Sequence, residues 1–76
     1  MNIAIIGYGR MGKTIEQIAR SRGHHIVHVH DGGPMDLEAL KAADVAIEFT
    51  KPEAAAENIT TLLTNDIPVV SGTTGW

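Results

Sequence analysis

The sequence predicts an α/β fold in which a parallel sheet carries helices on both faces. Short β-rich apolar runs alternate with longer segments of helical periodicity along the 76 residues, and this alternation is typical of βαβ units. The first apolar run, over residues 2–6, is continuous, as expected for a strand that is covered on both sides. A glycine-rich turn follows it and leads into an amphipathic helix.

Four strands and three helices follow from the pattern. We expect strands over residues 2–6, 26–30, 45–49 and 67–71, and helices over about 11–22, 36–42 and 52–64. Asp36 suits the N-cap of the second helix, Pro52 the first turn of the third, and Gly23 the end of the first. Right-handed crossovers predict the strand order 3-2-1-4. The apolar stripes expected to face the core are Met11, Ile15, Ile18 and Ala19 in the first helix and Ala55, Ile59, Leu62 and Leu63 in the third.

The chain stops directly after its fourth predicted strand. A doubly wound sheet normally continues there into another helix, so we expect one edge and part of one face of the sheet to lack cover. We therefore expect residues 1–76 to be the truncated, N-terminal part of a longer protein.

Composition excludes several classes of function. The net charge is −3 and Lys and Arg form no cluster, which argues against a nucleic-acid-binding surface. The chain has no cysteine, so disulfides, thiolate metal sites and cysteine nucleophiles are excluded. No apolar run approaches the ~20 residues needed to cross a bilayer. We expect a cytoplasmic protein with neither nucleic acid nor membrane as a partner.

The glycine turn is the strongest functional signal. Residues 7–12 read Gly-Tyr-Gly-Arg-Met-Gly and match the pattern G-x-G-x-x-G between a strand and a helix, which indicates a Rossmann-type dinucleotide-binding fold. Gly7 permits the tight turn, Gly9 lets a pyrophosphate approach the backbone, and Gly12 lets the helix pack closely on the sheet. The helix N-terminus offers N–H groups to the phosphates, and Arg10 can add a contact. The alternative is a turn that merely links strand to helix.

An acidic residue follows the second predicted strand. Asp31 lies 24 positions after Gly7, where an acid usually accepts hydrogen bonds from the adenosine ribose hydroxyls. A carboxylate there also repels a 2′-phosphate, which favours NAD(H). Arg10 or Lys51 can still accommodate that phosphate, so NADP(H) stays possible. The alternative role of Asp31 is to form a turn before Gly32 and Gly33.

Four histidines lie within residues 24–30, and two of them, His28 and His30, share one face of the second strand. A zinc site would need a third ligand, and none is evident, so we expect no metal site. His30 adjoins the predicted ribose site and is expected to line the adenosine pocket.

The ends of the third and fourth strands also face the predicted cofactor, because ligands of an open parallel sheet bind beyond its carboxyl edge. Small residues, hydroxyls and bare backbone there suit a nicotinamide ring and its carboxamide. A helix start and a flexible loop are the simpler explanations of the two segments. The candidate residues are Phe49, Thr50, Lys51, Gly72, Thr73 and Thr74.

Three segments together resemble the dihydrodipicolinate reductase family of bacterial lysine and diaminopimelate synthesis. That family has a glycine turn ending in Gly-Arg-Met-Gly, as residues 9–12 do. It has a strand ending in Asp-Phe-Thr or Asp-Phe-Ser, then a cation or small residue and Pro, and residues 48–52 match with Glu48 in place of the usual Asp. It has Gly-Thr-Thr-Gly after the fourth strand, as residues 72–75 do.

The resemblance implies a two-domain enzyme, usually a homotetramer, that reduces a cyclic dicarboxylate with NADH or NADPH. The positions it implies are Met11 and Gly12 beside the pyrophosphate, Asp31 at the ribose, Phe49 and Thr50 along the cofactor, and Gly72 and Thr74 at the nicotinamide carboxamide. The family's His-His motif with a nearby Lys, and its second Gly-Thr anion site, belong to a C-terminal domain that this sequence lacks. We therefore expect no catalytic residue here and no appreciable activity from this piece alone, because hydride transfer needs both reactants held close together.

Two other functions stay open at this point. The chain could be the first half of another dehydrogenase of the homoserine or aspartate type, although residues 48–50 and 72–75 favour the reductase. It could also be a non-catalytic nucleotide sensor, in which case the loop at residues 72–75 would have no purpose.

Overall fold

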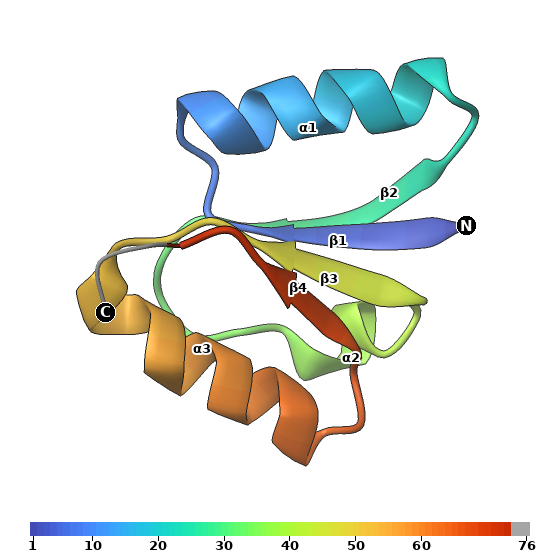
Figure 1. Ribbon diagram of the computed structural model, residues 1–76. Coiled ribbons are helices and arrows are strands. Elements are labelled where there is room, and N and C mark those ends of the chain that lie inside the picture. The colour runs from blue at the N-terminus through green and yellow to red at the C-terminus, as the bar shows by residue number, and fades with distance from the viewer. Residues whose placement is uncertain (74–76) are drawn as a thin grey trace.

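A computed structural model describes residues 1–73 as a four-stranded parallel sheet with helices on both faces (Figure 1). The strands are β1 (Asn2–Ile6), β2 (His25–His30), β3 (Val45–Glu48) and β4 (Val69–Ser71). The helices are α1 (Arg10–Ser21), α2 (Leu37–Leu40) and α3 (Pro52–Thr64). The predicted α/β class and all of the predicted elements are confirmed, with small shifts at their ends. Within this described part, no helix is both long and apolar enough to span a membrane.

The strand order differs from the expected 3-2-1-4 in the place of β3. The observed order is β2-β1-β3-β4, so β3 pairs with β1 instead of lying outside β2. The short α2 packs against β2, and the segment after it passes the start of β1, where the Asp44 amide donates to the Asn2 carbonyl at 2.7 Å, before it enters β3. The chain therefore changes direction between β1 and β3, and this is the switch point at which such sheets bind ligands.

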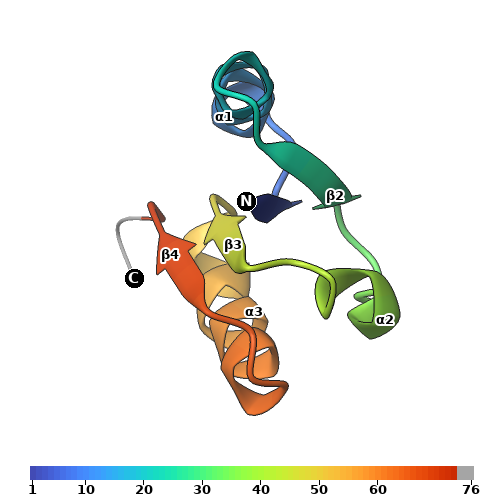
Figure 2. The same ribbon diagram turned by 90° about the vertical axis from the view of Figure 1, so that its right-hand side faces the viewer.

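The two faces of the sheet bury separate apolar clusters because successive side chains of a strand point to opposite faces. On one face, Ile3 and Ile5 of β1 pack with Ala19 of α1. On the other, Ala4 and Ile6 pack against residues from α2, β3 and α3. Figure 2 shows α1 alone on one side and α2 and α3 on the other. Residues 3–6 are all buried, which confirms a central strand covered on both faces.

Three apolar helix residues that were expected in the core are instead exposed. Met11 and Ile18 of α1 are 54% and 48% exposed, and Leu63 of α3 is 56% exposed. Met11 and Ile18 are exposed because α1 lies over β1 and β2, and no other element among residues 1–73 packs against the side of α1 (Figure 2). On the face of the sheet where α1 lies, no helix among the described residues covers β4, and Val70 of β4 is 60% exposed. One face of the sheet is therefore uncovered at β4 in the described residues, as expected.

The junction of β1 and α1 gives a stability prediction. A Cβ on Gly12 would lie 2.2 Å from the Gly7 carbonyl oxygen, and backbone cannot move away as a side chain can. We expect Gly12→Ala to lower the free energy of unfolding by about 2 kcal/mol or more, although alanine favours helix by about 1 kcal/mol. Gly9→Ala is the matched control, because a Cβ there meets nothing within 4 Å. It should lower stability by less than about 1 kcal/mol, through N-cap preference alone. Urea denaturation that finds the two variants equally stable would contradict this packing role.

Candidate functional site

The carboxyl ends of the strands meet at the edge of the sheet where α1 and α3 begin (Figure 1). β1 leads through residues 7–9 into α1, and β3 leads through residues 49–51 into α3. Because β1 and β3 are neighbours whose helices lie on opposite faces, their connections diverge at this edge. A cleft at the switch point is the result.

Gly7 is the point where three strand ends come together. Its N–H donates to the His30 carbonyl at the end of β2, with an N···O distance of 2.7 Å. Its φ of +97° is in the region that favours glycine, and a Cβ would lie 2.0 Å from the Phe49 carbonyl oxygen after β3. Only hydrogen fits between these backbones. Two residues on, Gly9 has open space on its Cβ side, so its backbone can be approached from outside.

The helices that begin at the cleft have no side-chain caps. Among the described residues, neither the N-cap of α1, Gly9, nor that of α3, Lys51, makes a side-chain capping hydrogen bond. The short α2 differs, because Asp36 Oδ1 accepts from the Ala39 amide at 3.1 Å, which confirms the predicted cap. The first turn of α1 also contains no acidic residue. Its N–H groups and the positive end of its dipole are therefore available to an anion.

Two cavities flank the glycine turn. The first has a volume of about 630 Å³ and lies between the loop after β2 and the first turns of α3. The second has a volume of about 440 Å³ and lies between the start of α1 and the end of β4. Both sizes are in the range of small-molecule sites. The residues that line both cavities, and so form the boundary between them, are Gly9, Phe49, Thr50 and Lys51.

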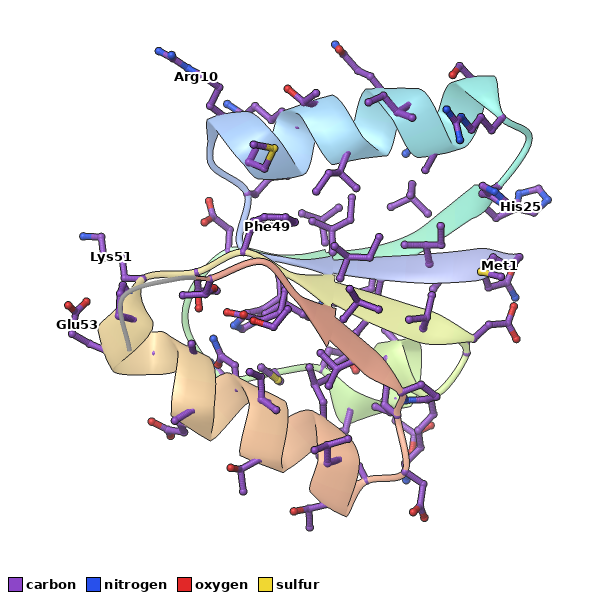
Figure 3. All side chains as sticks on the ribbon, viewed as in Figure 1. Met1, Arg10, His25, Phe49, Lys51 and Glu53 are labelled. Carbon is purple, nitrogen blue, oxygen red and sulfur yellow. The ribbon has the colours of Figure 1, made fainter. Side chains whose placement is uncertain are left out.

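Each predicted cofactor-binding residue within residues 1–73 lines at least one of these cavities. Besides the four shared residues, the first cavity is lined by Gly7 and Asp31, and the second by Arg10, Met11, Gly12, Gly72 and Thr73. Thr74 lies outside the described residues. Figure 3 shows Arg10 and Lys51 projecting at the end of the molecule where Phe49 lies. The structure thus brings together segments that are far apart in the sequence.

His30 and Asp31 occupy the wall of the first cavity, as expected from the sequence. The His30 side chain is buried, and its pKa is lowered first by burial and then by the nearby His28, against an opposing effect of Asp31. His30 is therefore neutral at pH 7. Among residues 1–73, no three His, Cys, Asp or Glu side chains are placed to hold a metal ion.

Tyr8 lies at the cleft although the sequence does not indicate it as a site residue. It lines the first cavity, and its hydroxyl donates to Glu16 Oε1 of α1 at 2.5 Å. The Lys13 ammonium lies 5.4 Å from the centre of the Tyr8 ring. The hydrogen bond to Glu16 raises the pKa of Tyr8. These contacts fix the ring against α1, and no spacing in the sequence indicates them.

Glu48 is a buried carboxylate that joins the ends of β3 and β4. Its side chain is fully buried, and each oxygen accepts from a different segment. Oε2 accepts from the Thr50 amide at 3.0 Å and from the Thr50 hydroxyl. Oε1 accepts from the Ser71 hydroxyl at 2.7 Å and the Thr73 hydroxyl at 2.8 Å. One negative charge therefore holds the two loops that border the second cavity.

The charge of Glu48 follows from a balance of two effects. Burial raises its pKa, because it disfavours the charged form. Hydrogen bonds from the side chains of Thr50, Ser71 and Thr73, and from the Thr50 amide, favour the charged form and together prevail. The pKa lies below its ordinary value of 4.5, so Glu48 is ionised at neutral pH. From the sequence, Glu48 is evident only as a replacement for Asp, and no motif there indicates a role for it.

This balance predicts how Glu48→Gln responds to pH. Because the folded-state pKa of Glu48 is depressed, its contribution is complete above about pH 4.5 and is lost as the pH falls through the folded-state pKa. At pH 7 we expect the glutamine variant to be less stable by about 1–3 kcal/mol, since some donors lose their acceptor. The difference should shrink when urea unfolding of both proteins is repeated from pH 7 down to pH 3. A difference that stays constant over that range would show that folding does not lower the pKa of Glu48.

Comparison with known proteins agrees with this arrangement. The chain matches the family model "Dihydrodipicolinate reductase, N-terminus" over residues 1–76. It is 55% identical to the 4-hydroxy-tetrahydrodipicolinate reductase of Christiangramia forsetii, 42% identical to that of Beutenbergia cavernae and 35% identical to that of Staphylococcus aureus strain Newman.

The first two alignments cover 100% of this chain and the third covers 99%. They cover 32%, 32% and 34% of the relatives, so the chain spans about a third of their length. The glycine turn, the two cavities and the match over all 76 residues lead to one conclusion: this chain belongs to the family of dihydrodipicolinate reductase N-terminal domains.

Proposed function

We propose that residues 1–76 are the dinucleotide-binding domain of a reductase that transfers hydride from NADH or NADPH to 4-hydroxy-tetrahydrodipicolinate, in lysine and diaminopimelate biosynthesis. One observation carries the proposal: two cavities of suitable size meet at the open backbone of Gly9, beside the uncapped start of α1. The relatives, which are named for this reaction, support the substrate. The family match favours this reductase over an enzyme of the homoserine or aspartate type.

The shape of the cleft suits the three parts of a dinucleotide. The pyrophosphate would lie over Gly9, where N–H groups of α1 point outward and Arg10 adds a positive charge. The adenosine would occupy the first cavity, with its ribose hydroxyls donating to Asp31. The nicotinamide would occupy the second cavity, which is lined by Met11 and Gly72. Lys51 borders both cavities and would add positive charge near the phosphates.

The chemistry assigned to these residues is binding and orientation. The dinucleotide, when bound, supplies the hydride. His30 is buried on the adenosine side and neutral, so it is not a proton donor to a substrate at the nicotinamide. We place the proton donor and the groups that bind the substrate carboxylates outside residues 1–76, and we expect the 76 residues alone to bind cofactor without turnover.

Binding of the cofactor is the first test. We expect NADH or NADPH to bind the chain with enhanced nicotinamide fluorescence, and Gly9→Ala to weaken binding by about tenfold or more, because its methyl group occupies the approach to the backbone. Gly9→Ala should keep its fold, since a Cβ there meets no other atom. The proposal fails if neither cofactor binds at millimolar concentration, or if the variant binds as tightly as the parent.

The choice between the two cofactors is the second test. Asp31→Ala removes both the acceptor for the ribose hydroxyls and the charge that repels a 2′-phosphate. We expect the ratio of NADPH to NADH dissociation constants to fall by about tenfold, as the loss of one hydrogen bond of about 1.4 kcal/mol implies. Glu38→Ala removes the same charge from α2, away from both cavities, and should leave the ratio unchanged. An unchanged ratio in Asp31→Ala would show that Asp31 does not bind the ribose.

A further inference from the structure

The negative charge of Glu48 determines the direction in which the surrounding hydroxyl groups point their protons. A hydroxyl has one proton to donate, whereas an ionised carboxylate can only accept. The hydroxyls of Thr50 and Ser71 therefore point their protons at Glu48. The Thr73 hydroxyl lies 2.8 Å from Glu48 Oε1 and 3.0 Å from the Thr50 carbonyl oxygen, so either acceptor keeps its proton inside this network.

Two of these hydroxyls belong to the wall of the second cavity. Thr50 and Thr73 line it, whereas Glu48 is fully buried and lines neither cavity. Because their protons are directed inward, these hydroxyl oxygens can offer a ligand only a lone pair. Each already accepts one hydrogen bond through one of its two lone pairs: Thr73 Oγ1 accepts from the Thr50 amide at 3.0 Å and Thr50 Oγ1 from Asn58 Nδ2 at 3.4 Å. The start of α1 lies across the same cavity, but its N–H groups are those proposed to bind the pyrophosphate. The wall formed by Thr50 and Thr73 is therefore the side of this cavity that can select a hydrogen-bond donor at the nicotinamide end.

A primary carboxamide matches this wall, because its NH₂ group donates. A methyl ketone of the same shape has only the acceptor. We propose that Glu48 is a positioning residue for the nicotinamide end of the site: it turns the hydroxyl protons of Thr50 and Thr73 inward, so that this wall selects a ligand that carries an NH₂ donor. This inference rests on the proposed function.

The test compares three ligands by calorimetric titration. NAD⁺ carries the carboxamide, 3-acetylpyridine adenine dinucleotide carries a methyl ketone in its place, and ADP-ribose lacks the nicotinamide ring. We expect the parent chain to prefer NAD⁺ over the ketone analogue by about tenfold, the value of one hydrogen bond. Glu48→Gln should abolish most of this preference, because the glutamine NH₂ donates to one hydroxyl and releases its proton toward the ligand. ADP-ribose should bind parent and variant equally.

Two further variants separate this role from a structural one. Glu48→Asp keeps a carboxylate but changes the side-chain length, and it should retain the preference, although glutamine is the closer match in shape. Thr73→Val removes one hydroxyl and its hydrogen bond to Glu48 but leaves the carboxylate in place, and it should reduce the preference even if Glu48→Gln fails to fold.

The outcomes are distinct. If Glu48→Gln weakens ADP-ribose as much as NAD⁺, or if the preference is the same in the parent chain, Glu48→Gln and Thr73→Val, the positioning role is overturned while the proposed function stands. If the parent binds neither NAD⁺ nor ADP-ribose, the proposed function fails and this inference fails with it. We expect the preference to be lost in Glu48→Gln, retained in Glu48→Asp and reduced in Thr73→Val, while ADP-ribose binds the parent chain and Glu48→Gln equally.

Discussion

The arrangement of this molecule depends on the close approach of backbones at Gly7. The Gly7 amide bonds to the end of β2, its missing Cβ makes room for the carbonyl of Phe49 after β3, and its own carbonyl is packed against Gly12 of α1. Three strand ends and one helix start therefore converge through close contacts of their backbones. Because Gly9 at the N-cap has no side chain, the N–H groups at the start of α1 are left at the surface of the cleft, where an anion can reach them.

The part of the cleft that contains the second cavity is held together by a buried charge and not by close backbone contacts. There the ends of β3 and β4 are joined by the buried charge of Glu48 and the hydroxyls that surround it. Phe49 ties this half to the first, because its backbone contacts Gly7 and its ring lies where a Cβ on Gly72 would be, 1.9 Å from the nearest ring carbon. One half of the cleft thus offers bare backbone for phosphates, and the other offers oriented hydroxyls for an amide.

Much of the fold could be predicted from the sequence because the relevant constraints are local. Periodicity located the helices and strands, and the glycine turn indicated the site because its three glycines, its strand and its helix are contiguous. The place of β3 could not be predicted in this way, since it depends on long-range contacts, such as the hydrogen bond from the Asp44 amide to the Asn2 carbonyl, that bring the chain past β1. The exposure of Met11 and Ile18 has the same origin, because a helix pattern does not reveal which strands the helix crosses.

The candidate site was predicted in outline but not in its internal chemistry. Residues of the glycine turn and the strand ends were expected at the cleft, and the structure places them there. The partners of Glu48 on β4 lie 23 and 25 residues away from it, so no spacing rule indicates them before β3 and β4 are known to be neighbours. The family resemblance drew attention to position 48 but did not explain why an ionised group belongs inside the sheet.

The central claim is that backbone N–H groups at the start of α1 bind a pyrophosphate. The most direct measurement is an NMR titration of the ¹⁵N-labelled chain with ADP-ribose, following each backbone amide. The account predicts the largest shift changes at the amides of residues 9–11, with smaller changes at Asp31. Amides of the glycine turn that stay unmoved while another surface responds would contradict it.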